Sequence, residues 1–162
     1  MSAVRTSLLV ARGPRWPLRR ILAVTRGRHE DLGVAEWAAI LAKSSGASIT
    51  LQVVMPELPT ACESYVRGAI MLQGRELSMP LGRQLQALRE LHPAWAQTGV
   101  LRCRSGSPTA QVRREVADLD PDLVITGPDS ASWLSRRLTG CLACGLVRDG
   151  ERPVLVARSR SG

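Results

Sequence analysis

The sequence predicts a three-layer α/β domain with a mainly parallel sheet of five strands. Two observations predict this fold class. Short apolar runs rich in Val, Ile and Leu alternate along the chain with segments whose apolar residues recur at helical spacing. The length of 162 residues also suits one domain, and the 44% of hydrophobic residues is near the average for globular proteins.

One strand–helix–strand unit spans residues 19–54. Residues 19–25 (RRILAVT) and 48–54 (SITLQVV) are rich in β-favouring residues and predict two strands. Between them, residues 34–46 predict a helix that ends at Gly46, after the loop 26–33. Strand, helix and strand in this order predict a right-handed crossover between parallel strands.

The middle of the chain predicts a loop up to residue 80 and then a helix over residues 81–91, where Leu81, Leu85 and Leu88 share one face. His92 marks the end of that helix rather than a catalytic base. Residues 99–105 (GVLRCRS) alternate in polarity, which indicates an edge strand with Cys103 as a small buried hydrophobe.

The last third of the chain predicts a helix over residues 109–120, capped by Ser107 or Thr109. Residues 121–127 (PDLVITG) then form a strand covered on both faces. Another helix begins near Cys141, and residues 152–159 (RPVLVARS) form the fifth strand. Ligands of such sheets bind at the carboxyl ends of the strands. We therefore expect a binding site in the loops that begin at Thr25, Met55, Ser105 and Gly127.

The net charge of +8 belongs to the N-terminal segment, because the chain has no acidic residue before Glu30, and beyond residue 29 it carries 15 basic and 14 acidic residues. We expect residues 1–18 to be a flexible basic arm and residues 19–160 to be the domain. A targeting segment or contact with an acidic surface are the alternatives for the arm. The domain lacks the basic stripe with interleaved aromatics of nucleic-acid binders.

The cellular setting is predicted from two absences in the sequence. No apolar run approaches the roughly 20 residues that cross a bilayer, so we expect no membrane partner. Four cysteines without a secretory signal predict reduced thiols in the cytoplasm.

Five motifs in the right order resemble the universal stress protein family. They are ILAVTRGR, ITLQVVMPE, SGSPTAQV, DLVITG and TGCLACGLVRDGERPVLVAR, which together cover most of residues 20–158. The resemblance implies a Rossmann-like sheet, as in adenine nucleotide alpha hydrolases, with strand order 3-2-1-4-5. It also implies a role in stress response or signalling and a homodimer through the C-terminal strand Val154–Ala157. An apolar strand at the sheet edge would leave backbone groups for a partner strand to pair.

The ATP-binding branch of that family carries a glycine signature whose spacing survives here as Gly127, Ser130, Gly140 and Cys141. Glycines of this kind let backbone N–H groups approach phosphate at a helix N-terminus. Ser130 replaces the middle glycine, and Cys141 replaces a Ser or Thr. Arg26 stands where the family usually has an Asp that meets the nucleotide, which removes an acceptor for ribose hydroxyls but offers a phosphate ligand.

The resemblance therefore implies ATP with Mg²⁺, or a related adenine nucleotide, as the ligand. The candidate nucleotide-binding residues are Thr25, Arg26, Val53, Gly106, Gly127, Ser130, Gly140 and Cys141. The alternative that stays open is a dimeric interaction module that binds no nucleotide.

Cys141 and Cys144 form a C-x-x-C pair with three interpretations. The first is two small residues in the first turn of a helix packed on the sheet. The second is a thiol redox sensor, because a helix N-terminus lowers the pKa of a thiol. The third is a zinc site, which lacks two further ligands at a suitable spacing. We assign no catalytic residue and no metal ligand, and we expect a binding module rather than an enzyme, with slow nucleotide hydrolysis at most.

Overall fold

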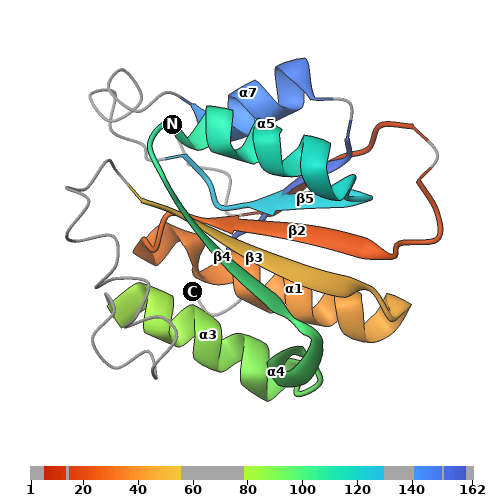
Figure 1. The fold of residues 1–162 in the computed structure, drawn as a ribbon, viewed down its shortest axis with the longest axis vertical. Coiled ribbons are helices and arrows are strands. Elements are labelled where there is room, and N and C mark those ends of the chain that lie inside the picture. Colours follow the sequence, from red (N-terminus) through yellow and green to blue (C-terminus); the bar gives the residue numbers. More distant parts are fainter. Residues whose placement is uncertain (1–5, 14, 56–78, 130–140, 151, 160–162) are drawn as a thin grey trace.

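The computed structural model describes residues 6–13, 15–55, 79–129, 141–150 and 152–159 (Figure 1). Its elements are, in chain order, β1 (Leu8–Val10), β2 (Arg20–Thr25), the short 3-10 helix η1 (His29–Asp31), α1 (Leu32–Ser45), β3 (Ser48–Met55), α3 (Met79–Leu91), α4 (Trp95–Thr98), β4 (Val100–Ser105), α5 (Pro108–Leu119), β5 (Leu123–Thr126), α7 (Leu142–Asp149) and β6 (Val154–Val156).

The sheet has the order β1-β6-β5-β2-β3-β4. The five strands predicted from the sequence are β2 to β6, they pair in parallel, and they follow the expected order 3-2-1-4-5. The structure adds a sixth strand, β1, which pairs antiparallel with β6. The predicted fold class is therefore confirmed, with one more strand than expected.

Helices cover both faces of the sheet, as Figure 1 shows. On one face Ile21 and Ala23 of β2 join a core with α1, α3 and α4. On the other face Leu22 and Val24 of the same strand join a core with α5 and α7. Alternate residues of β2 thus face opposite layers, and all except Arg20 are buried, because both sides of a central parallel strand are covered.

The expected helix boundaries agree closely with the structure. α1 ends before Gly46, whose φ of +74° suits glycine. Ser107 is the N-cap residue of α5, and α3 ends one residue before His92. None of the helices among the described residues has the length and apolar character needed to cross a membrane.

Part of the basic arm belongs to the sheet, whereas the sequence suggested a flexible segment over residues 1–18. Leu8 to Val10 pair with Val156 to Val154, so β6 is not the edge strand that we expected. The side chains of Leu8 and Leu9 remain 60% and 58% exposed. An apolar pocket of about 520 Å³ lies where this arm meets α1, β5 and β6.

The opposite edge strand, β4, is held to α5 by an ion triad. Glu115 of α5 is wholly buried, and its carboxylate pairs with Arg102 at 2.7 Å and with Arg104 at 3.3 Å. Both arginine side chains are about one-third exposed. The alternating arginines predicted to deter pairing at this edge thus also anchor the helix.

Replacing Glu115 with Ala should lower the free energy of unfolding by about 2 kcal/mol. The change leaves two arginines without their shared partner, but their partial exposure lets water solvate them, so the loss should fall below that of a wholly buried pair. Urea unfolding measures it. Glu90→Ala on the exposed side of α3 is the control and should change stability by under about 0.5 kcal/mol. Equal effects of the two changes would contradict the anchoring role.

Candidate functional site

Four parallel strands end at one edge of the sheet, as predicted. β2 ends at Thr25, β3 at Met55, β4 at Ser105 and β5 at Thr126. Since the strands are parallel and adjacent, the loops that follow them gather at this carboxyl edge.

The predicted nucleotide residues are distributed unevenly around this edge. Thr25 is buried, and its Oγ1 accepts a hydrogen bond from the backbone N–H of Gly27 at 2.9 Å. Val53 is 1% exposed and packs against Leu81 in the core. Gly106 follows β4 with a φ of +106°, a conformation that suits glycine. Ser130 and Gly140 lie outside the described residues, and the remaining three candidates, Arg26, Gly127 and Cys141, belong to the polar network described below.

Asp31 is the most buried charged group at this edge, with no exposed surface. Its Oδ2 accepts hydrogen bonds from the backbone N–H of Arg26 at 2.8 Å and of Arg28 at 3.4 Å. The guanidinium groups of the same two residues lie 3.8 and 3.5 Å from its Oδ1. Asp31 is the N-cap residue of α1, but its carboxylate accepts no hydrogen bond from that helix and faces the end of β2 instead.

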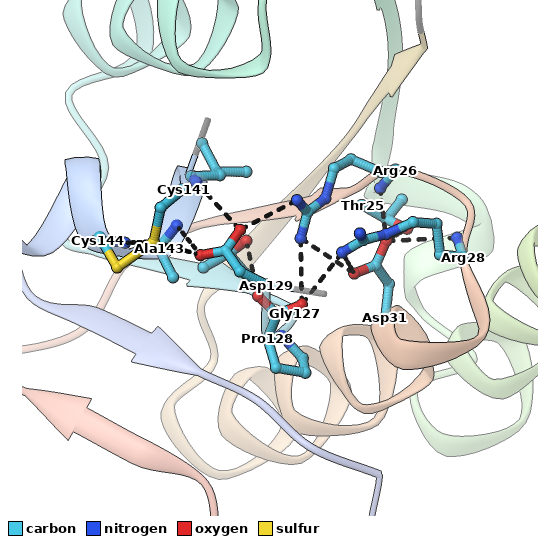
Figure 2. A network of polar contacts seen from close by, with 12 residues as sticks. Thr25, Arg26, Arg28, Asp31, Gly127, Pro128, Asp129, Cys141, Ala143 and Cys144 are labelled. Atoms are coloured by element: carbon cyan, nitrogen blue, oxygen red, sulfur yellow. Dashed lines mark hydrogen bonds and ion pairs between the residues drawn. A yellow bond between two sulfur atoms is a disulfide. The ribbon is translucent and has the colours of Figure 1, made fainter. Parts of the chain in front are cut away.

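Asp129 is the second carboxylate of the edge, and it caps α7 (Figure 2). Its two oxygens accept hydrogen bonds from the backbone N–H groups of Leu142 at 3.1 Å and Ala143 at 3.0 Å. The Arg26 guanidinium pairs with the same carboxylate at 3.1 Å, and both side chains are only 11% exposed. A helix N-terminus and a guanidinium thus form one anion site, filled here by a side chain of the protein itself.

Arg26 joins the two carboxylates into one network. Its guanidinium contacts both Asp31 and Asp129, and it also donates to the backbone oxygen of Pro128 at 3.3 Å. Arg28 donates to the same oxygen at 3.1 Å. Two arginines and two aspartates give the network no net charge, which is the usual condition for burying charged groups.

Gly127 lets the end of β5 approach this network. A Cβ atom at this position would collide with Asp31 Oδ1 and lie 3.0 Å from the Asp31 Cα atom. Gly127 therefore provides space for the buried carboxylate, and its predicted place beside a nucleotide phosphate stays a prediction.

Cys141 and Cys144 are bonded as a disulfide, whereas the sequence analysis expected reduced thiols. Cys141 is the N-cap residue of α7, and its sulfur accepts a hydrogen bond from the Cys144 backbone N–H at 3.1 Å. The same sulfur lies 2.8 Å from Asp129 Oδ2. Ligand atoms of Asp129 and both cysteines lie within 4.8 Å of one another, but the cysteines can bind a metal ion only as thiolates, which the disulfide excludes.

Sequence reasoning identified part of this site. Arg26, Gly127 and Cys141 were among the predicted residues, whereas Asp129 was not, because its carboxylate caps a helix that begins 13 positions later in the chain. Asp31 was missed, because it lies in a strongly charged loop, RGRHEDLG, that reads as solvated. The sequence signal for it is a carboxylate in a short loop just before a helix, together with a glycine directly after another strand.

The fold and the edge geometry define a class of three-layer α/β proteins with an anion site at the end of a central parallel strand. The sequence profile of the universal stress protein family matches residues 17–158. Because this match spans most of the chain, the protein belongs to the universal stress protein family. None of the curated proteins compared with the chain matches it significantly.

Solved structures of the family share the fold. A universal stress protein crystallised in complex with cAMP aligns with a TM-score of 0.58 at 18% identity, over 87% of this chain and 97% of that one. One from Archaeoglobus fulgidus aligns with a TM-score of 0.58 at 14% identity, over 86% and 93%. A putative universal stress protein from Pseudomonas aeruginosa aligns with a TM-score of 0.62 at 18% identity, over 93% of this chain and 51% of that longer chain.

Replacing Gly127 with Ala should destabilise the protein strongly, by about 3 kcal/mol or more, because the new methyl group meets the buried Asp31. Gly145→Ala is the matched control. A Cβ there would lie 3.6 Å from Thr109 Cγ2, an ordinary contact, and alanine favours the helix over glycine by up to about 1 kcal/mol. Thermal unfolding of both variants measures the difference. A Gly127→Ala protein as stable as the wild type would show that the network does not need this close approach.

Proposed function

We propose that this chain is a universal stress protein module that binds an adenine nucleotide at the carboxyl edge of its sheet. The observation that carries the proposal is the anion site formed by Leu142 N–H, Ala143 N–H and Arg26, which holds the carboxylate of Asp129. A phosphate accepts hydrogen bonds from the same kinds of donor, so it can take the place of this carboxylate.

The charges around the site favour a ligand with a single phosphate. Arg26 is shared with Asp31, and Asp129 stays tethered close to the site even when displaced. A triphosphate would bring several negative charges beside these two aspartates, and Mg²⁺ would have to offset them. We therefore expect a nucleoside monophosphate or a cyclic nucleotide to bind better than ATP with Mg²⁺. The complex of a related fold with cAMP supports this choice of ligand class.

In this proposal Asp129 is an internal competitor of the ligand. Its carboxylate must leave the N-terminus of α7 before a phosphate can enter, so part of the binding energy is spent on displacing it. Arg26 takes the role of phosphate ligand at the position where the family usually has an acid. The remaining predicted residues, including Ser130 and Gly140, stay candidates for contacts with the nucleotide.

Replacing Asp129 with Asn should tighten the binding of cAMP or AMP by about tenfold, because the competing charge is lost while the side chain keeps its shape. Arg26→Lys should weaken binding, since an ammonium group cannot form the forked contact of a guanidinium. Isothermal titration with cAMP, AMP and ATP–Mg²⁺ measures all three affinities.

Arg89→Ala is the control for this experiment, because Arg89 lies on an exposed part of α3, in its last turn and so away from the carboxyl edge. It removes one positive charge without touching the site. If neither the wild type nor Asp129→Asn binds any of the three nucleotides at millimolar concentration, the nucleotide proposal fails and the interaction module without nucleotide takes its place.

We also propose that the homodimer through Val154–Ala157 forms only when the N-terminal arm leaves β6. The arm occupies the backbone edge that a partner strand would need, through the pairing of Leu9 with Leu155. It is a strand of only three residues with two exposed leucines above an apolar pocket, so its release should cost little.

A chain that lacks residues 1–10 should therefore form more dimer than the full chain at equal concentration. Light scattering coupled to size-exclusion chromatography measures the mass of each form. Loss of β1 leaves N–H and C=O groups of β6 without partners, and the β6 strand of a second chain can pair with them. A shortened chain that stays monomeric at high micromolar concentration would contradict this arrangement.

A further inference from the structure

We propose that Cys141 and Cys144 form a redox-active thiol–disulfide pair whose state sets how firmly Asp129 is held at the N-terminus of α7. The pair lies in the first turn of the helix, directly beside the anion site (Figure 2). Three observations support this assignment, and each concerns a different property of the pair.

The first observation is accessibility. Cys144 is exposed, whereas Cys141 is partly buried against Asp129. An incoming thiol therefore has a defined point of attack on the disulfide, the sulfur of Cys144, with Cys141 as the leaving group. Exposed disulfides are the ones that exchange readily with thiols in solution.

The second observation is the size of the loop that the bond closes. Cys141 and Cys144 are three residues apart, within a single helical turn. In the chain-entropy account, the stabilisation by a disulfide increases with the length of its loop, so this bond constrains the unfolded chain very little. Global stability therefore does not explain the position of the pair.

The third observation is the contact between Cys141 and Asp129. As part of a disulfide, the Cys141 sulfur has no proton, yet it lies 2.8 Å from Asp129 Oδ2. After reduction, the Cys141 S–H can donate a hydrogen bond to this carboxylate oxygen. The reduced pair thus adds a fourth donor to Asp129, beside Leu142 N–H, Ala143 N–H and the Arg26 guanidinium, and the oxidised pair removes it.

The reaction is thiol–disulfide exchange with a low-molecular-weight thiol. A thiolate attacks the Cys144 sulfur, the bond between the two cysteines breaks, and Cys141 leaves as a thiolate that takes up a proton. A second thiol then attacks the external sulfur of the mixed disulfide and releases Cys144 as a thiol. The protein disulfide gains two electrons and two protons, and two external thiols become one disulfide.

The redox equilibrium can be measured in the full chain with glutathione buffers of varied reduction potential. Cys62 and Cys103 are replaced by Ser so that only the pair reacts. After acid quenching and alkylation, intact mass reports the dithiol and disulfide fractions. We expect a reversible two-electron transition. A pair that remains dithiol, or remains disulfide, across the whole range of glutathione potentials would overturn the proposal.

Asp129→Asn tests the coupling to the carboxylate. The variant loses the charge-assisted hydrogen bond that the dithiol form gains, so the equilibrium should move toward the disulfide by about tenfold, equivalent to about 30 mV. Asp118→Asn on an exposed part of α5 is the matched control and should leave it unchanged. Equal reduction potentials of the cysteine pair in the two variants would show that Asp129 does not affect the redox equilibrium. Circular dichroism confirms that each variant is folded.

A last experiment rests on the proposed function. If the anion site binds a nucleotide, the disulfide form should bind cAMP more tightly than the dithiol form, because Asp129 is then held by fewer donors. The Cys144→Ser chain provides a form that cannot make the disulfide. If no nucleotide binds in either state, only the proposed function fails, since the glutathione titration does not depend on a ligand. Equal binding by both states would refute control of the site by the pair.

Discussion

The carboxylate of Asp31 is wholly buried at the end of β2, and the carboxyl edge of the sheet is arranged to compensate its charge. A buried carboxylate is costly unless donors and cations surround it. Here the loop after β2 turns back so that Arg26 and Arg28 offer it both backbone N–H groups and guanidinium groups. The residue that follows the neighbouring strand β5 must be a glycine, Gly127, because any side chain there would take the space of this carboxylate.

Arg26 links the buried carboxylate of Asp31 to the other side of the site, where Asp129 lies. Since its guanidinium also pairs with Asp129, the end of β2 is linked to the N-terminus of α7, which lies more than 100 positions away in the chain. The anion site, the proposed phosphate position and the Cys141–Cys144 pair all meet at Asp129. A change in any one of them therefore acts on the same carboxylate, and through it the proposed redox change of the pair would alter the proposed binding of a nucleotide.

The two edges of the sheet are protected in different ways. At β4, two outward arginines share the buried Glu115, so charge both deters a partner strand and anchors α5. At β6, the protection is a strand of the same chain, β1, which supplies the missing backbone partners. The protection at β4 depends on a buried ion triad and is therefore firm. The protection at β6 depends on a three-residue strand with exposed side chains. Edge protection by a short strand leaves that edge open to regulation.

The sequence by itself determined the elements whose signals are local. Helical spacing, apolar runs and turn residues predicted the main helices and five strands, and the family resemblance supplied their order. The contact of Asp129 with α7 has no such local signal, because this helix begins 13 positions further along the chain. The tertiary structure alone decided that Asp31 is buried, because this depends on Gly127, which is distant in the chain. It alone decided that residues 8–10 pair with β6, since backbone pairing of an acid-free arm leaves no periodic signal. Long-range contacts of this kind depend on the space that other elements leave, which local sequence patterns do not encode.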